Sequence, residues 1–280
     1  GENIPVEYDL YIERFNAIYD AVRKVDTSIV FICSAWWRQQ LPEQMEKIFK
    51  TLDGKASMWD YHPYADALTC NVKAEDGISK MDEFFHKWNP DTKMKCVIFE
   101  ENGVTHGLKR ALGHALIQNL ARRHGDFIVA CCAANALQPW QQHDTHWDQG
   151  QIFFTPDKVW LQPCGWAQQM AASAHRDLLV AGASEDSEVL LSATKSRNGQ
   201  SLVVHLVNAA TTAKPIDFAF VDNSRWEVVH ATTLTGDDPL ADNVPEDLSH
   251  VVPKDVTDAF ARMSILPAYS YTVVELHKVK

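Results

Sequence analysis

Two adjacent glutamates, Glu100 and Glu101, are the carboxylates of this sequence that are best placed to do chemistry. They close the apolar run CVIF and are followed by Asn102 and Gly103. A short continuous apolar run is typical of a buried strand in a parallel sheet, and residues that end such strands line the active sites of α/β barrels. Successive strand residues point to opposite faces, so we expect only one of the two to face a barrel mouth. The alternative is an acidic strand end that faces solvent.

A second predicted strand end combines imidazole and aromatic groups. The segment WDYHPY places His62 and Tyr64 two residues apart, where a short β-type run ends. Both side chains can hydrogen-bond a polar ligand, while the tryptophan packs. A half-buried histidine that is satisfied by its neighbours is the alternative interpretation.

The segment NALQPWQQHDTHW has the composition of a sugar-binding loop, because amides pair with hydroxyl groups and aromatic rings pack on sugar faces. Asn135 and Gln138 are its candidate substrate contacts. His143 and His146 are three residues apart, but no third ligand has a convincing spacing, so we predict no metal site. The sequence has no G-x-G-x-x-G, phosphate-loop or G-x-S-x-G motif, which excludes the common nucleotide-binding and serine-hydrolase classes.

The elements that must position these residues alternate between strand and helix up to about residue 176. Apolar spacing predicts helices at 6–25, 42–52, 75–88, 106–124 and 165–175, and strands at 28–34, 57–62, 94–101 and 127–133. This alternation predicts βαβ units and a parallel sheet. After about residue 178, short β-type runs separated by turn residues predict an antiparallel sandwich. The predicted fold class is therefore α/β plus all-β.

The composition excludes several partner classes. The chain has 280 residues and a formal net charge of −11, so it lacks the basic surface that binds nucleic acid. No apolar run approaches the ~18 residues of a membrane-spanning helix. Six cysteines without a C-x-x-C pair favour reduced thiols over a disulfide framework or a zinc cluster. No signal-peptide pattern is visible.

Several longer segments together resemble the C-terminal part of α-L-arabinofuranosidases of glycoside hydrolase family 51. They are WDYHPY, VIFEENG followed by LKRALGHAL, ANALQPWQQHDTHWDQGQIFF, VWLQPCGWAQQM, TLTGDDPLADNVPEDLSHVVP and LPAYSYTVVEL. The resemblance implies a (β/α)8 TIM barrel followed by a jelly-roll-like β-sandwich. It also implies retaining hydrolysis of terminal α-L-arabinofuranosyl groups in arabinan or similar polysaccharides, with no cofactor. Another retaining glycosidase of the same clan (a xylosidase or endoglucanase) and a non-catalytic carbohydrate-binding module stay open as alternatives.

The strand count then divides the chain. If the four strands are the fifth to eighth of the barrel, residues 1–176 form its C-terminal half and residues 177–280 form the sandwich. We expect such a chain to be a fragment without the first half of the barrel. Whether it is active alone, whether it forms a homo-oligomer that covers open sheet edges, and whether it is secreted or cytoplasmic are left open.

The resemblance also implies roles for single residues. Alignment with the family's strand assigns the nucleophile to Glu101. By the strand count, Glu2 falls where the family's Asn-Glu acid/base motif ends, although Gly1 stands where the family has asparagine. A retaining enzyme needs these two carboxylates about 5–5.5 Å apart. His62 and Tyr64 match the family's His-x-Tyr pattern beside the nucleophile.

Overall fold

The computed structural model describes residues 7–142 and 148–279, which form two compact units. The first unit comprises Gly1–His62, Val72–Glu100 and Asp126–Cys132. The second unit comprises Pro63–Asn71, Glu101–Gly125 and Ala133–Lys280. The chain therefore passes from one unit to the other several times, and one of these passages separates Glu100 from Glu101.

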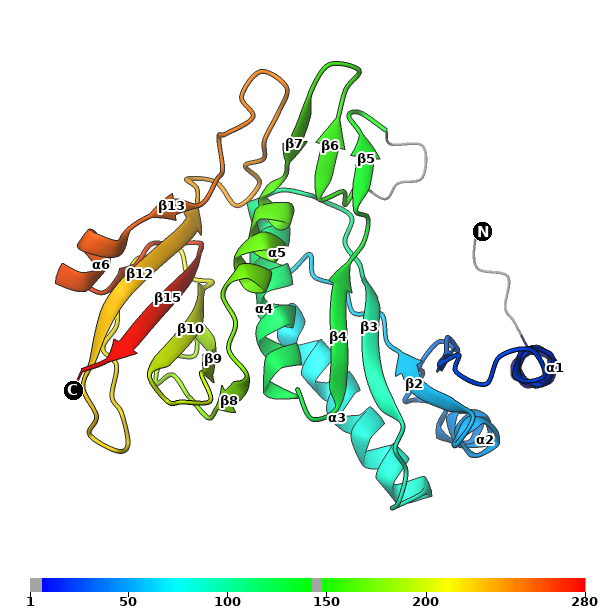
Figure 1. Cartoon of the computed structure of the whole chain (residues 1–280). Coiled ribbons are helices and arrows are strands. Elements are labelled where there is room, and N and C mark those ends of the chain that lie inside the picture. Colours follow the sequence, from blue (N-terminus) through cyan, green and yellow to red (C-terminus); the bar gives the residue numbers. More distant parts are fainter. Residues whose placement is uncertain (1–6, 143–147, 280) are drawn as a thin grey trace. The chain divides into compact units, whose positions relative to one another are not determined.

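A four-stranded sheet organises the first unit, with the strand order β1-β2-β3-β4. Its strands β2, β3 and β4 are labelled in Figure 1. Strand β1 pairs with β2, and β2 with β3, in parallel, as the alternation of elements predicted. The elements are α1 (Tyr8–Arg23), β1 (Phe31–Cys33), α2 (Pro42–Leu52), β2 (Ala56–Asp60), α3 (Cys70–Trp88), β3 (Lys95–Glu101) and β4 (Ile128–Ala133). Because β2 ends at Asp60, His62 lies in the loop beyond the strand.

Aromatic packing anchors β2 in the first unit. Helix α2 begins at a proline and buries Met45, Ile48, Phe49 and Leu52 on one face, at the spacing of an amphipathic helix. The ring of Phe49 lies 4.8 Å from that of Phe85 on α3, which in turn lies 5.7 Å from the fully buried Trp59 on β2. This rigid core fixes the strand end that carries Asp60.

A six-stranded antiparallel sheet organises the second unit, in the order β13-β12-β15-β10-β9-β8. Its strands are β8 (Leu178–Val180), β9 (Val189–Lys195), β10 (Ser201–Asn208), β12 (Trp226–Thr235), β13 (Lys254–Asp255) and β15 (Ser270–Lys278). The hairpin between β9 and β10 turns at Gly199, whose φ of 68° suits glycine. The antiparallel region that the sequence predicted is thus present.

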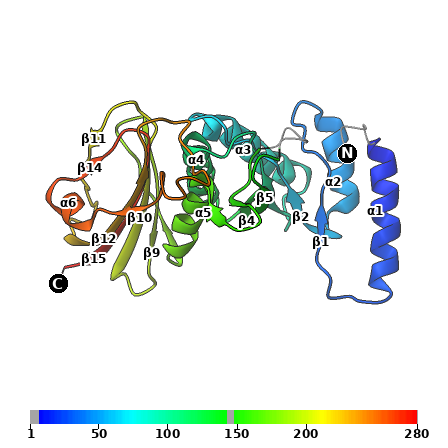
Figure 2. The same ribbon diagram turned by 90° about the horizontal axis from the view of Figure 1, so that it is seen from above.

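Both faces of this sheet are covered. Val204 and Leu206 on β10 belong to a core cluster with Phe260 and Leu266. These last two residues come from α6 (Thr257–Arg262) and from the small sheet of β11 (Lys214–Pro215) and β14 (Ile265–Leu266), which lie beside the large sheet in Figure 2. The second layer of the predicted sandwich therefore includes one short helix and two short strands, and Ile216, Phe218 and Phe220 pack against the same cluster.

Two helices cover the opposite face. Helix α4 (Leu108–Arg123) contacts β9 and β10, and α5 (Pro163–Ser173) contacts α4, β12 and β15. These contacts place both helices in the second unit, so the compact units do not divide at residue 176. The domain boundary between residues 176 and 177 stays a prediction.

A three-stranded sheet lies between α4 and α5 in the sequence, formed by β5 (Leu137–Pro139), β6 (Ile152–Phe154) and β7 (Val159–Leu161). These strands are too short to show an alternating pattern, so the sequence did not predict them. No helix in the described part of the chain is long and apolar enough to cross a membrane. All six cysteines are free thiols.

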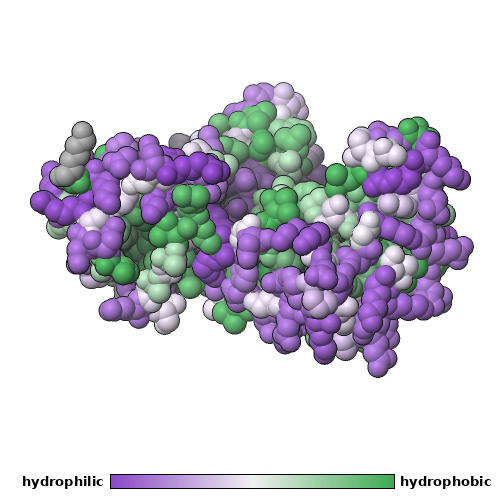
Figure 3. Space-filling view, turned by 60° about the horizontal axis from the view of Figure 1, so that its bottom comes forward, coloured by the Kyte–Doolittle hydropathy of each residue, from purple (hydrophilic) through white to green (hydrophobic). Residues whose placement is uncertain are grey.

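Apolar side chains also reach the surface. On the face shown in Figure 3, apolar patches interrupt a mainly hydrophilic surface. The exposed apolar side chains include Phe99 on β3 and Val129 on β4, which are 45% and 61% exposed. Parallel sheets are usually covered on both faces, so this degree of exposure in strand residues is unusual.

Candidate active site

Three polar side chains of the first unit meet where β2 and β3 end. Asp60 is the last residue of β2, His62 follows it by two positions, and Glu100 is the last residue but one of β3. His62 Nε2 lies 2.9 Å from Asp60 Oδ2, and His62 Nδ1 lies 3.8 Å from Glu100 Oε2. The imidazole is therefore held between two carboxylates.

Asp60 uses both of its oxygens in this arrangement. Its Oδ1 accepts the backbone N–H of Phe99 at 3.0 Å, and its Oδ2 pairs with His62. The side chain of Asp60 is 13% exposed, whereas that of Glu100 is 50% exposed. Asp60 is thus a largely buried support, and Glu100 is the more accessible carboxylate.

The hydrogen bond that His62 donates to Asp60 raises the pKa of His62 above its ordinary value. Burial opposes this effect, and the negative charges of Asp60 and Glu100 add to it. A protonated imidazole donates from both ring nitrogens, which suits a position between two acceptors. His62 therefore stays cationic to a higher pH than an isolated histidine.

Trp36, in the loop after β1, forms an aromatic wall beside this cluster. Its ring meets that of His62 edge-on, with centroids 5.9 Å apart, and it is 54% exposed. A half-exposed indole next to charged hydrogen-bonding groups gives a sugar an apolar surface and polar partners together.

Glu101 belongs to the second unit and has different surroundings. It is fully buried, and its carboxylate oxygens pair with Arg110 and His114 of α4. Burial alone raises the pKa of this carboxyl, but the charges of Arg110 and His114 outweigh burial and lower it. Glu101 is therefore buried, whereas the neighbouring Glu100 is exposed. The assignment of the nucleophile to Glu101 stays a prediction.

The buried ion pairs continue into neighbouring elements. His114 Nε2 lies 2.7 Å from Gln168 Oε1 on α5, and Arg110 also donates to the carbonyl of Glu101 at 3.0 Å. A Cβ atom on Gly103 would come within 2.6 Å of Arg110 Cδ, so a residue without a side chain is required there. These contacts tie the end of β3 to α4 and α5.

Tyr64 remains accessible, as its predicted role requires. It is 44% exposed, and it forms an isolated parallel bridge with Asn102. Asn102 donates its N–H to Pro63 and accepts that of Ala65, both at 2.8 Å. The backbone on each side of Tyr64 is therefore held in place.

The two predicted amide contacts differ in accessibility. Gln138 is 3% exposed, its Nε2 donates to Gln142 O and Asp148 Oδ1, and its Oε1 accepts the N–H of Gly150. It therefore supports its own loop. Asn135 is exposed, and its backbone carbonyl accepts the N–H of Gln151 at 3.0 Å.

Three residues discussed above lie outside the described part of the chain: Glu2, the predicted acid/base, and His143 and His146. Among the residues that the structure describes, no cluster of three or more histidine, cysteine or acidic side chains could hold a metal ion.

Comparison with known proteins decides the family. The model of the α-L-arabinofuranosidase C-terminal domain matches residues 98–270, which is more than half of the chain. The chain belongs to this family. The match begins within β3 and includes both Glu100 and Glu101.

A curated relative supports the same family membership. α-L-Arabinofuranosidase A of Aspergillus kawachii is 24% identical over 241 residues, which are 83% of this chain and 34% of that protein. The chain thus spans about a third of the length of the curated relative.

Solved structures show the same fold. The α-L-arabinofuranosidase from Thermotoga maritima aligns with a TM-score of 0.78 and 16% identity, over 98% of this chain and 63% of that one. The family 51 arabinofuranosidase from Xanthomonas axonopodis pv. citri aligns with a TM-score of 0.73 and 15% identity, over 97% and 63%. The resemblance to the C-terminal part of family 51 arabinofuranosidases is confirmed.

The sequence motifs did not identify two residues of the cluster around His62, which are Asp60 and Trp36. Asp60 stands inside the motif WDYHPY, but nothing in its spacing distinguishes a buried support from a surface acid. Trp36 stands in a loop that no motif marks. Both become recognisable only when the ends of β1, β2 and β3 are brought together.

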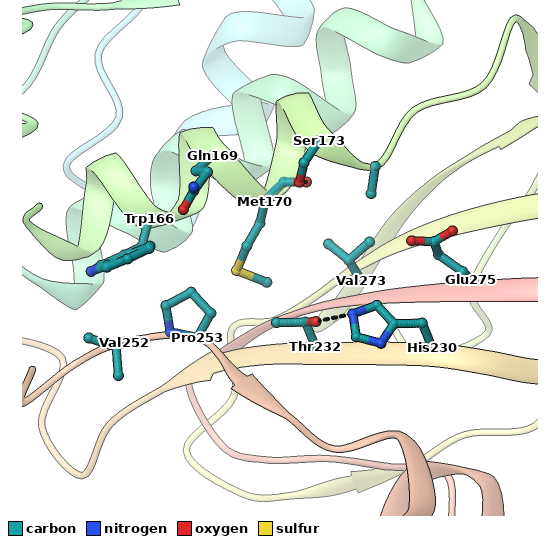
Figure 4. Close-up of a pocket in the computed structure, with 11 residues that line it drawn as sticks. Trp166, Gln169, Met170, Ser173, His230, Thr232, Val252, Pro253, Val273 and Glu275 are labelled. Carbon is teal, nitrogen blue, oxygen red and sulfur yellow. Dashed lines mark hydrogen bonds between the residues drawn. The ribbon is translucent and has the colours of Figure 1, made fainter.

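The second unit has a cavity of about 520 Å³, separate from the cluster around His62. Figure 4 shows Trp166 and Met170 on α5 facing His230 and Thr232 on β12, with Glu275 on β15 nearby. Thr232 hydrogen-bonds His230 at 3.0 Å, and Glu275 pairs with Arg176 at 2.8 Å. The cavity shares no lining residue with the Asp60–His62–Glu100 cluster.

Proposed function

We propose that this chain supplies the nucleophile and part of the sugar-binding surface of a retaining α-L-arabinofuranosidase, which releases terminal arabinofuranosyl groups from arabinose-containing polysaccharides. The observation that carries the proposal is the half-exposed Glu100 carboxylate beside His62 and Trp36. Membership of the arabinofuranosidase C-terminal domain family supports the substrate class.

The proposed architecture is the C-terminal half of a (β/α)8 barrel over residues 1–176, followed by a β-sandwich over residues 177–280. In this assignment β1 to β4 are the fifth to eighth barrel strands. The parallel pairing of β1, β2 and β3 supports it. So does the exposure of Val129, since barrel strands have a second face that packs inside the barrel.

Within this proposal the nucleophile is Glu100. Glu101, which the family alignment favoured, has both carboxylate oxygens committed to Arg110 and His114 and has no exposed surface. An attacking carboxylate must reach the anomeric carbon, so accessibility favours Glu100 by a clear margin.

The reaction then follows the two-step course of a retaining glycosidase. A carboxylate oxygen of Glu100 bonds to the anomeric carbon while the bond to the leaving oxygen breaks, and a general acid protonates that oxygen. Water then cleaves the glycosyl ester, and the same acid residue, now a base, takes its proton. Glu2 is proposed for this role; Tyr64 and Asn135 are proposed to bind the sugar hydroxyls.

The test compares Glu100→Gln with Glu101→Gln on 4-nitrophenyl α-L-arabinofuranoside. Both the 280-residue chain and the chain with any segment that its gene encodes before Gly1 are assayed. In the active form, we expect Glu100→Gln to lower kcat/KM by roughly 1,000-fold or more, and a 2-fluoro arabinofuranoside to label Glu100. Label on Glu101 would restore the original assignment.

Substrate panels separate the alternatives. Turnover of a nitrophenyl xyloside instead of the arabinofuranoside would indicate a xylosidase. Retention on insoluble arabinoxylan without turnover in either form would indicate a carbohydrate-binding module. Product of inverted anomeric configuration, detected by proton NMR, would exclude the covalent mechanism.

A further inference from the structure

The contacts of Asp60 give this residue a task that neither its motif nor the family comparison assigns. It is nearly buried, and each of its two carboxylate oxygens has a partner: the backbone N–H of Phe99 and the ring of His62. It therefore links the strand segment that carries Glu100 to the imidazole that faces Glu100.

The acceptor character of Asp60 determines the proton position on His62. An ionised carboxylate only accepts hydrogen bonds, so the His62 Nε2 that lies 2.9 Å from Asp60 carries a proton. The second nitrogen, Nδ1, then faces Glu100 Oε2 at 3.8 Å. In the neutral ring, Nδ1 would direct a lone pair at a carboxylate; in the protonated ring, it directs an N–H.

The two charged groups around His62 both favour the protonated ring. Asp60 comes from β2 and Glu100 from β3, and both are acidic. Trp36, from the loop after β1, meets the ring edge-on and is uncharged. The pKa of His62 is accordingly raised, with the Asp60 hydrogen bond as the largest cause.

We propose that Asp60 is a positioning residue, which holds His62 protonated on both nitrogens so that Nδ1–H faces Glu100 and orients that carboxylate. When Glu100 forms the glycosyl ester, its charge disappears, and the same N–H becomes available to the ester oxygen or to a sugar hydroxyl. The mechanistic part of this proposal rests on the proposed function, whereas the protonation of His62 does not.

The first experiment reads His62 directly and needs no activity. In the full chain labelled with ¹⁵N-histidine, two-dimensional NMR reports the tautomer and titration of each ring. We expect His62 to titrate above pH 6.5 and to keep its proton on Nε2 when neutral. In Asp60→Asn the amide preserves the shape but removes the charge, so the midpoint should fall by at least about half a pH unit.

Asp82→Asn is the matched control, because Asp82 also lies beside a histidine, His86, at 3.1 Å on the exposed face of α3. It should leave the His62 titration unchanged. If Asp60→Asn does not fold, the unmodified chain still decides: a neutral His62 with its proton on Nδ1, or a midpoint below 6.5, overturns the proposal.

The second experiment reads catalysis in the active form. If protonated His62 is needed, kcat/KM falls as pH rises through the pKa of His62. Asp60→Asn should move this decline to lower pH and reduce kcat/KM about 10- to 100-fold above it, the value of one charge-assisted hydrogen bond. An unshifted pH profile with unchanged kcat/KM would contradict the mechanistic part of the proposal even if the NMR result holds. Absence of turnover in the unmodified protein would contradict only the proposed function.

Discussion

At the residue scale, one peptide bond separates two carboxylates with opposite roles. Glu100 is half-exposed beside His62, whereas Glu101 is buried with Arg110 and His114. The difference arises because consecutive strand residues point to opposite faces. The chemistry of the side chains is identical, so their surroundings decide which one can meet a substrate and which one stabilises the fold.

This difference predicts unequal effects on stability. Glu101→Gln leaves the guanidinium of the fully buried Arg110 without its ion-pair partner, and breaking such a pair costs about 3–5 kcal/mol. Glu100→Gln should change the free energy of unfolding by less than about 0.5 kcal/mol, as expected for an exposed position. Urea unfolding followed by circular dichroism at pH 7 measures both. Equal stabilities for the two variants would show that Glu101 is not held as described.

At the element scale, the segment after β12 fastens the start of α4. The carbonyls of Ala241 and Pro239 accept the N–H groups of Leu108 and Lys109 at 2.8 and 2.7 Å. The first N–H groups of a helix have no partner within the helix, so this segment supplies them. His106 adds a side-chain link, with Nε2 2.8 Å from Asp242 Oδ2.

The link through His106 predicts a pH dependence. Burial lowers the pKa of His106, but the hydrogen bond to Asp242 and the charge of Asp148 outweigh burial and raise it. The stabilisation is therefore fully present below the unfolded pKa of ~6.5 and is lost as pH rises through the folded value.

Asp242→Asn should consequently lower stability by about 1–2 kcal/mol at pH 6 and by much less at pH 9. Thermal unfolding over this pH range measures the effect. Asp247→Asn is the control, because Asp247 lies 3.6 Å from the exposed His250 in the same segment, and it should show little change. A penalty for Asp242→Asn that grows with pH would contradict a raised pKa for His106 in the folded chain.

At the scale of the whole molecule, exposed apolar side chains on the parallel sheet predict association. Val129 on β4 is 61% exposed in a kind of sheet that is normally covered on both faces. We expect the 280-residue chain at micromolar concentration to elute from a sizing column as more than a 31.6 kDa monomer.

A substitution on the sheet tests this expectation. Val129→Lys should shift the chain towards the monomer, whereas Val221→Lys, at a fully exposed site in a loop, should not. Light scattering across a concentration series gives the mass independently of shape. A monomer at all concentrations would show that this sheet face is not an association surface.

The sequence by itself determined the family, the order of helices and strands up to β4, and the two strand ends that carry polar groups. Apolar periodicity encodes a helix such as α2 locally, and the motifs around His62 and Glu100 can be recognised in short segments without any tertiary contact.

Tertiary structure decided which glutamate is accessible, and that Asp60 and Trp36 join His62 in one cluster. It also decided that Gln138 is buried within its own loop. The physical reason is that burial and ion pairing depend on residues far apart in the chain: Arg110 and His114 bury Glu101 from the next helix, and the ends of three strands converge at Glu100. The sequence of a strand predicts that its side chains alternate between two faces. Only the helices and strands that pack against it determine which face is accessible to solvent.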